Sequence, residues 1–348
     1  MELIKAAGAA AALFALLLAA ACQSAPVDDA ADPVDTAEAA PPVEPDGPVE
    51  NAPDETGEAA PVACAPEIIR TVSVIDRGDV RVWRSGPAVG FTSHMFVNAD
   101  GAPDAYRPDG SGLSFTCDGL VAFESGRCVF PSGNPDWQPR CNAAYARALA
   151  ADWDGEHVCV FGFEMAGGRR VGTATVGGRP LIQGADDPRP GNYVSATAMR
   201  VKDAPPQTQR RYVDSRRIPF FVLPGALRTQ IGASVGARGS VGIVARAQSG
   251  RTVSAVAADL GPSWQLGEGS IALHRAVGSD PMIVRDGVER AKRNILDDVT
   301  YVVFPDVTVE GVVDADAFGG AIDAAAQNAF AAWGGAEKLN ACVVAASR

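Results

Sequence analysis

The sequence predicts a β-rich barrel with peripheral helices. Short apolar or alternating runs, separated by Gly, Pro and Asp, dominate the second half of the chain, as is typical of strands. Helix signals are few and lie mostly toward the end of the chain. The chain has 348 residues, 47% of them hydrophobic, which is enough to bury a sizeable core.

Six runs fit strands because they are short, rich in β-branched or aromatic residues and bounded by turn-forming residues. They are Val80–Trp83, Val158–Phe163, Ile218–Leu223, Val241–Ala247, Val253–Ala258 and Tyr301–Phe304. Ser249-Gly250 separates two of these runs and predicts a hairpin turn.

Three segments predict helices: residues 142–152, Ser270–Val277 and the Ala-rich Asp314–Trp333. The last begins with acidic residues and is followed by two glycines, as helix capping and the helix dipole favour. No internal repeat is evident, so we expect residues 63–348 to form a single domain.

Residues 1–21 predict a lipoprotein-type signal peptide. After Lys5 comes an apolar run that is too short for a comfortable membrane span and that ends in small residues before Cys22. This end resembles the lipobox of bacterial lipoproteins, which implies that Cys22 is acylated and anchors the protein in the bacterial outer membrane. The alternative is an ordinary signal peptide and a periplasmic or secreted protein.

Residues 22–62 are predicted to be a disordered acidic tether. Residues 25–62 hold eleven acidic side chains and no Lys or Arg, and they show no amphipathic period. Of the net charge of −12, residues 63–348 therefore carry only −1. A nucleic-acid binder needs a basic surface, so nucleic acid is not an expected partner.

Six cysteines remain beside Cys22, and in an exported chain this even number predicts up to three disulfides. The spacing leaves all 15 possible pairings open. The chain has no CxxC motif, its three His residues are scattered, and it has no phosphate-binding loop. We therefore expect neither a metal site nor a cofactor.

The segment from Val253 to Gly278 is the best candidate for chemistry. An apolar run ends at Asp259, a turn follows, and Glu268 stands between two glycines just before a predicted helix. Two carboxylates brought to one cleft are what acid/base hydrolysis of a glycosidic bond requires. A turn Asp and a helix-start Glu would give the same pattern.

Four blocks, in the same order, resemble the chitosanases of glycoside hydrolase family 75. The first is Asn98-Ala-Asp-Gly-Ala-Pro-Asp-Ala-Tyr106, and the second is Tyr193-Val-Ser-Ala-Thr197. The third, Tyr212 to Pro224, is similar to that family's "VDS..IPY.VLP" run. The fourth joins Asp259-Leu-Gly-Pro262 to Gly267-Glu-Gly-Ser-Ile-Ala-Leu273 and is similar to "GD.GP…GEGSIALA". The resemblance covers roughly residues 95–280, but residues 114–190 do not match in detail.

This resemblance implies inverting hydrolysis within a β-1,4-linked glucosamine chain, with Asp259 and Glu268 as the catalytic pair. We expect Asp259 to be the general acid, since partial burial would raise its pKa, and Glu268 to be the base, since a helix dipole favours its ionised form. Candidate substrate-binding residues are Asp104, Tyr106, Asp214 and Trp264. His274 is expected on the surface.

The region around Asp259 also distantly resembles double-psi β-barrel domains, which include lytic transglycosylases. This likeness implies a six-stranded double-psi-like barrel with the carboxylate on its rim. It leaves two alternatives to a chitosanase: a peptidoglycan-remodelling hydrolase or lytic transglycosylase, and a non-catalytic barrel that binds envelope polysaccharide. A transglycosylase can work with a single carboxylate. The second carboxylate, Glu268, is therefore the feature that distinguishes a two-carboxylate hydrolase from a transglycosylase.

Overall fold

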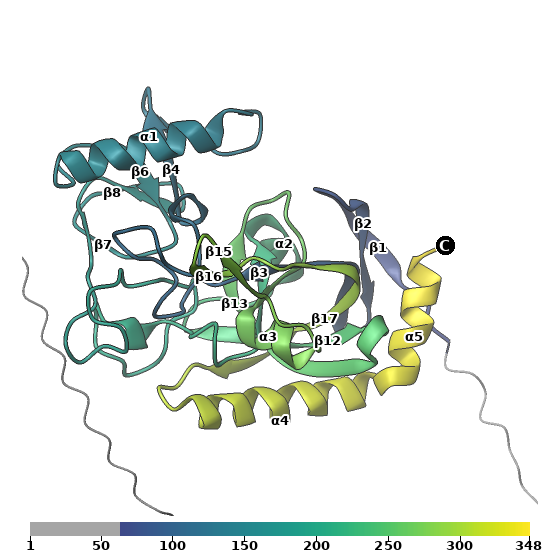
Figure 1. Ribbon diagram of the computed structural model, residues 1–348. Coiled ribbons are helices and arrows are strands. Elements are labelled where there is room, and N and C mark those ends of the chain that lie inside the picture. Colours follow the sequence, from purple (N-terminus) through teal and green to yellow (C-terminus); the bar gives the residue numbers. More distant parts are fainter. Residues whose placement is uncertain (1–62) are drawn as a thin grey trace, which may run out of the picture. The chain divides into compact units, whose positions relative to one another are not determined.

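Six strands close into a barrel, because β3 (Ala88–Asn98) pairs both with β14 (Glu268–Ser270) and with β17 (Ile295–Glu310) (Figure 1). The other three strands of the barrel are β11 (Phe220–Pro224), β12 (Arg238–Arg246) and β13 (Arg251–Gly261). The pairs β11–β13 and β14–β3 are parallel, and the remaining four are antiparallel. The computed structural model describes residues 63–348, which belong to one compact unit.

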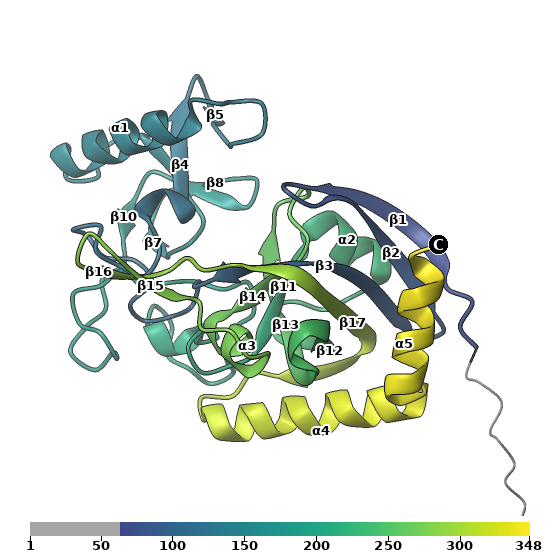
Figure 2. The same ribbon diagram turned by 45° about the vertical axis from the view of Figure 1, so that its right-hand side comes forward.

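Five α-helices lie at the periphery of these strands (Figure 2). They are α1 (Trp137–Ala150), α2 (Gly225–Ile231), α3 (Ile271–Ala276), α4 (Ala315–Trp333) and α5 (Gly335–Ala346). The mainly β class, the six-stranded barrel and the peripheral helices of the prediction are thereby confirmed. None of the helices within residues 63–348 is long and apolar enough to cross a membrane.

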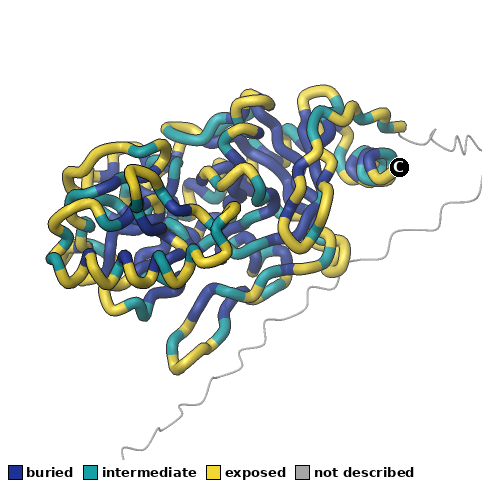
Figure 3. Tube along the Cα trace, turned by 90° about the horizontal axis from the view of Figure 1, so that it is seen from above, coloured by how far each residue is buried: buried dark blue, intermediate teal, exposed yellow. Residues whose placement is uncertain are grey.

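Successive side chains of a strand point to opposite faces of the sheet, and the barrel strands bury apolar side chains on both faces. One cluster lines the interior and includes Phe91 stacked on Tyr301, with ring centroids 4.7 Å apart. The other lies on the outer face, where Phe304 of β17 and Phe318 of α4 belong to one buried cluster between the sheet and that helix. Figure 3 shows the buried residues gathered inside the traced chain and the exposed ones mostly at its outer turns. The side chain of Asp314 caps α4 by accepting hydrogen bonds from the first turn, as predicted.

A second sheet forms a small lobe, which we define as residues 116–180. Its strand order is β5-β4-β6-β9-β8, and α1 packs on β4 and β6. Its strands are β4 (Leu120–Glu124), β5 (Arg127–Cys128), β6 (Val158–Val160), β8 (Arg169–Val171) and β9 (Ala174–Val176). The short pair β7 (Met165–Ala166) and β10 (Arg179–Pro180) also belongs to it.

Two further hairpins complete the fold. The first, β1 (Glu67–Val74) with β2 (Gly78–Ser85), extends the barrel sheet beside β3. The second, β15 (Met282–Arg285) with β16 (Val288–Ala291), stands between α3 and β17 in the chain. Each of the six predicted strands overlaps an observed one, and the predicted turn at Ser249-Gly250 connects β12 to β13, with Gly250 at φ 64°.

All six cysteines of the described residues form disulfides, so the predicted number is confirmed. The pairs are Cys64–Cys342, Cys117–Cys141 and Cys128–Cys159. The first fastens the start of the described chain to α5, and the other two lie in the small lobe. Three disulfides indicate an oxidising, exported environment. The predicted acylation of Cys22 and the tether lie outside the described residues.

Candidate active site

Asp259 and Glu268 are brought together by strand register. Asp259 lies on β13 and Glu268 begins β14, and both pair with the same residue of the strand between them, Val222 of β11. Residues paired in this way project from the same face of a sheet. The turn between the two carboxylates therefore places them on opposite sides of one central strand.

The side chain of Glu268 leans across Val222 toward β13. Its Oε2 atom lies only 2.7 Å from where a Cβ atom on Gly261 would be, and Val222 Cγ1 lies 3.1 Å from the same point. Gly261 is two residues beyond Asp259, which corresponds to about 6.7 Å along a strand. The absence of a side chain at Gly261 thus leaves room for the Glu268 carboxyl group close to Asp259.

The other two glycines of this segment, Gly267 and Gly269, lie where the barrel leaves no room for a side chain. Gly267 has a φ of +99°, and a Cβ there would lie 2.2 Å from the carbonyl oxygen of His94. At Gly269 a Cβ would lie 2.9 Å from side-chain atoms of both Leu273 and Met95. These glycines therefore permit close backbone packing on either side of Glu268.

Asp259 is only 9% exposed and is held by backbone donors. Its Oδ1 atom accepts hydrogen bonds of 2.9 Å from the N–H groups of Ala198 and Leu260. Burial raises its pKa to about 6, while these hydrogen bonds and the nearby charge of Arg200 act in the opposite direction.

Glu268 has a higher proton affinity than Asp259. Burial, followed by the negative charges of Asp259 and Asp118, raises its pKa to about 8. Near pH 7 the pair therefore holds one proton, mainly on Glu268. This order is opposite to the expected one: Glu268 lies on a strand, two residues before the Ser270 cap of a six-residue helix, so the helix dipole does not dominate its environment.

A third carboxyl group, Asp100, was not among the predicted site residues. The hydroxyl of Tyr106 donates a 2.6 Å hydrogen bond to its Oδ1 atom. Burial and then the charge of Asp259 raise the pKa of Asp100 well above its usual range, with a smaller contribution from Glu268. In the sequence it stands within Asn98-Ala-Asp-Gly101, which is typical of an ordinary turn, so only the resemblance block contained it.

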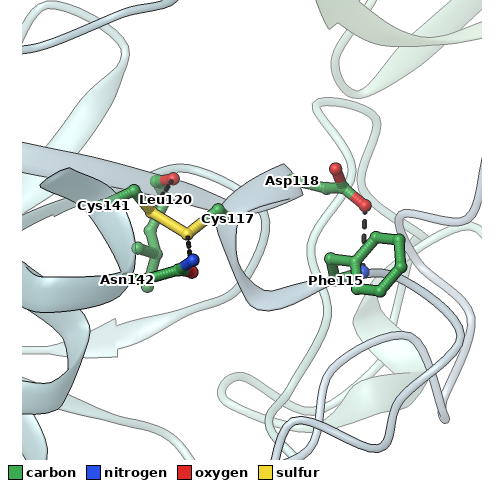
Figure 4. The surroundings of a disulfide bond; sticks show 6 residues. All are labelled: Phe115, Cys117, Asp118, Leu120, Cys141 and Asn142. Atoms are coloured by element: carbon green, nitrogen blue, oxygen red, sulfur yellow. Dashed lines mark hydrogen bonds between the residues drawn. A yellow bond between two sulfur atoms is a disulfide. The ribbon is translucent and has the colours of Figure 1, made fainter. Parts of the chain in front are cut away.

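Asp118 lies in the small lobe, and its negative charge contributes to the raised pKa of Glu268. It accepts hydrogen bonds from the N–H of Phe115, at 2.9 Å, and forms an ion pair with Lys292, at 2.7 Å. It follows Cys117 directly, and Figure 4 shows it beside the Cys117–Cys141 disulfide. No spacing in the sequence points to this residue, because its approach to the site depends on how the small lobe packs on the barrel.

Two of the predicted substrate-binding residues, Asp104 and Asp214, line cavities. Asp104 forms a bidentate pair with Arg216, at 2.9 and 2.7 Å, and lines a cavity of about 660 Å³. Asp214 accepts a 2.8 Å hydrogen bond from the N–H of Arg216, as an Asx turn does, and lines an adjacent cavity of about 320 Å³. No hydrogen bond within residues 63–348 joins either aspartate to Asp259 or Glu268.

The other two predicted substrate-binding residues, Tyr106 and Trp264, differ in how far they are exposed. Tyr106 is 2% exposed and is occupied by its hydrogen bond to Asp100, so its ring offers no face to a sugar. Trp264 is partly exposed on the loop between β13 and β14, where a substrate could reach it. The surface position expected for His274 is wrong: it is fully buried against the barrel, and burial lowers its pKa to about 4.

Within residues 63–348, no cluster of three or more His, Cys, Asp or Glu side chains could hold a metal ion. No Lys or Arg in this part of the chain forms an ion pair with Asp259 or Glu268. The site consists of an ionisable pair that shares a proton, with a third carboxyl group beside it.

Comparison with known proteins does not identify the chain: no protein family model matches it, and no curated protein matches it significantly.

Proposed function

We propose that the protein is an endo-acting glycoside hydrolase that cleaves β-1,4-linked glucosamine polymers by an inverting two-carboxylate mechanism. The observation that carries this proposal is the pairing of Asp259 and Glu268 with the same residue, Val222. The resemblance of four ordered sequence blocks to family 75 chitosanases supports the substrate class.

Inversion sets a geometric requirement on the two carboxyl groups. Glu268 Oε2 lies against Gly261, two residues beyond Asp259 on β13, so the two side chains share one part of the sheet. Inverting glycosidases hold their carboxyl groups about 6.5–9.5 Å apart, which leaves room for the attacking water, whereas retaining enzymes need about 5–5.5 Å.

The difference in pKa between Glu268 and Asp259 supports their proposed roles. With its pKa raised to about 8, Glu268 holds a proton near neutral pH and is the general acid that protonates the departing glycosidic oxygen. With a pKa of about 6, Asp259 is ionised and is the general base that removes a proton from water. The water oxygen then bonds to the anomeric carbon as the glycosidic bond breaks, and the anomeric configuration is inverted.

The charge of the site suits an amine-bearing sugar. After burial, the charge of Asp259 is the largest cause that raises the pKa values of Glu268 and Asp100, and no Lys or Arg of residues 63–348 forms an ion pair with any of the three. An ammonium group of glucosamine could supply the missing positive charge. This local cluster, rather than the nearly neutral domain as a whole, would attract the polymer.

Anchoring to the outer membrane through acylated Cys22 is part of the proposal. It would hold the enzyme in the oxidising environment that the three disulfides indicate. Labelling with a radioactive or clickable fatty acid, compared between the parent and Cys22→Ser, tests it. Label in the parent alone supports acylation, and label in neither protein contradicts it.

Incubation of the purified protein with chitosan, and separately with peptidoglycan, tests the activity. Shortened glucosamine oligomers and new reducing ends from chitosan are expected. Anhydromuropeptides from peptidoglycan would instead identify a lytic transglycosylase. Binding of either polymer without turnover would support a non-catalytic barrel.

A further inference from the structure

Two phenylalanine side chains lie next to each other on the surface of the small lobe. Phe130 is 41% exposed and Phe161 is 37% exposed. Their ring centroids are 6.1 Å apart, and the ring planes are tilted by 34°. Aromatic side chains gain much free energy from burial, so two neighbouring rings left in water mark a surface that another molecule covers. We call this pair the Phe130–Phe161 platform.

Strand alternation places both rings on the face of the small-lobe sheet that lies away from α1. The face toward α1 consists of residues that share one buried cluster with that helix: Leu120, Ala122, Val129, Val158 and Val160. Phe130 follows Val129 and Phe161 follows Val160, so both rings point the other way. Two backbone hydrogen bonds of 2.9 Å, from Val129 to Ala122 and from Phe161 to Gly119, extend the pairing with β4 to this point.

The Cys128–Cys159 disulfide fixes the two rings relative to each other. It joins β5 to β6, and each phenylalanine follows one of its cysteines by two residues. Since residues two apart in a strand share a face, the covalent link lies on the same face as the rings. A pair held in this way loses little conformational freedom when it meets a ligand, which favours binding.

The faces of these two rings carry no cation of the protein. Other rings have a Lys or Arg side chain over them, namely Phe115, Phe123, Tyr212 and Trp333. Within residues 63–348, no Lys or Arg lies over Phe130 or Phe161 in this way. The negative face of an aromatic ring attracts an ammonium group and packs against C–H groups. A glucosamine unit offers both.

The platform is connected to the candidate active site by a short run of backbone contacts. Gly162 follows Phe161, and its carbonyl accepts a 2.9 Å hydrogen bond from the N–H of Ala196. Two residues further along the chain, the N–H of Ala198 donates to Asp259 Oδ1, also at 2.9 Å. One segment of chain therefore borders both the platform and the carboxyl pair, so a polymer bound at Asp259 can extend to the rings.

We propose that Phe130 and Phe161 bind the glucosamine polymer, by stacking on sugar units remote from the bond that is cleaved. The inference deepens the proposed function and rests on it, because it assigns a further part of the same polymer to the small lobe. Binding to remote units favours long chains over short ones and helps to hold the scissile bond at the carboxyl pair. Neither ring takes part in proton transfer.

The test compares Phe130→Ala, Phe161→Ala and the double variant with the parent. Phe161→Tyr is the conservative variant, because it keeps an aromatic ring face. Leu149→Ala is the matched control, since Leu149 is 42% exposed in the same lobe but belongs to α1. Circular dichroism and thermal unfolding establish that each variant is folded.

The kinetic readout is the dependence on chain length. Each alanine variant should raise KM for long-chain chitosan about 3-fold and the double variant about 10-fold, with kcat changed less than about 2-fold. On the shortest oligomer that the parent cleaves, all variants should match the parent, because this substrate does not reach the platform. Phe161→Tyr and Leu149→Ala should match the parent on both substrates. Unchanged KM in the double variant, or an equal loss on short and long substrates, would overturn the inference.

Binding of a long glucosamine oligomer to the Glu268→Gln variant separates this inference from the proposed function. Shifts of the Phe130 and Phe161 ring protons in NMR spectra, with about 10-fold weaker binding by calorimetry when both rings are replaced, support the platform even if the parent hydrolyses no chitosan. Hydrolysis by the parent without such shifts and without weaker binding would overturn the platform and leave the proposed function in place. Binding of the rings to anionic phospholipid vesicles, but not to the oligomer, would also overturn it.

Discussion

The barrel and the small lobe hold their parts of the site by different means. In the barrel, Asp259 and Glu268 are placed by hydrogen-bonded register on either side of β11, so their separation is fixed by strand spacing. In the small lobe, Asp118 ends a one-turn 3-10 helix (Thr116–Asp118). The two glycines that contact Tyr106, Gly119 and Gly162, lie in connecting segments held by short strands and two disulfides. In the proposed mechanism, the barrel supplies the reacting groups, and the small lobe alters their electrostatic surroundings through Asp118.

This difference predicts how strongly substitutions in each region should affect hydrolysis. Changes to the barrel pair should abolish hydrolysis, whereas changes to the small lobe should alter proton affinity and stability while leaving the pair in place.

The largest effect is expected from Glu268→Gln, which keeps the shape of the side chain but removes the transferable proton. Chitosan hydrolysis should fall by about 10³-fold, within the usual range for loss of a general acid or base. Reducing-end release at saturating substrate measures it, with Glu337→Gln on the exposed surface of α5 as control. Activity within about 3-fold of the parent would show that Glu268 is not catalytic.

Gly261→Ala should reduce hydrolysis by roughly 10- to 100-fold without unfolding the protein, because misplacement by about 1 Å can cost this much. The added Cβ would lie 2.7 Å from Glu268 Oε2 and displace that carboxyl group, while the backbone at this position does not need positive φ. Gly236→Ala is the control, since no atom lies within 4 Å of a Cβ there. Equal activity of the two variants would mean that Glu268 need not lie against β13.

The pH dependence of kcat/KM should be bell-shaped. The base must be ionised, so the rate falls as the pH drops below the Asp259 pKa of about 6. The acid must be protonated, so the rate also falls above the Glu268 pKa of about 8, tenfold for each further unit. Initial rates between pH 4 and 10 test this expectation. Activity that keeps rising from pH 8 to 10 would contradict the assignment of Glu268 as acid.

Removing the Cys117–Cys141 disulfide by Cys117→Ser with Cys141→Ser should reduce activity by several-fold, because Asp118 follows Cys117 directly. It should also lower stability by about 3 kcal/mol, as expected for a loop of this length. The matched comparison is Cys64→Ser with Cys342→Ser, which frees the end of the described chain from α5, far along the sequence from the site. That pair should lower the melting temperature but leave kcat unchanged. An equal loss of kcat in both pairs would remove the distinction between the regions.

The smallest effect is expected from Asp104→Asn. Asp104 is paired with Arg216, so its loss should cost about 1 kcal/mol of stability and change KM by less than about 2-fold. Chemical denaturation and steady-state kinetics measure the two quantities. A KM raised about 10-fold or more would instead place Asp104 in contact with the polymer.

The same contrast explains how much could be predicted from the sequence. The barrel strands are apolar runs bounded by turns, so all of the predicted strands in the second half of the chain lie within or overlap observed ones. The long helix α4 carries its own cap and was also predicted. In contrast, β14 has only three residues, and the neighbours that make it a strand come from β3 and β11.

Helices α1 and α5 were harder to predict, because their ends carry weaker local signals. The helix expected over residues 142–152 begins earlier, at Trp137, because Pro139 is accommodated within the first turn. The last helix, α5, was not predicted, since the glycines at 334 and 335 indicated an end rather than a new start. The order of the two pKa values differs from the expected one for a related reason: burial by distant parts of the chain, rather than a neighbouring helix, is the main cause of the raised pKa of Glu268.

The configuration of the first product tests the central claim most directly. NMR of chitosan oligomers, recorded within the first turnovers and before mutarotation, distinguishes the α from the β anomer at the new reducing end. The proposed inverting mechanism, with Asp259 and Glu268 both paired to Val222, predicts α-anomeric products in the parent and none in Glu268→Gln. Initial products in the β form, or undiminished hydrolysis by the variant, would contradict the two-carboxylate inverting site.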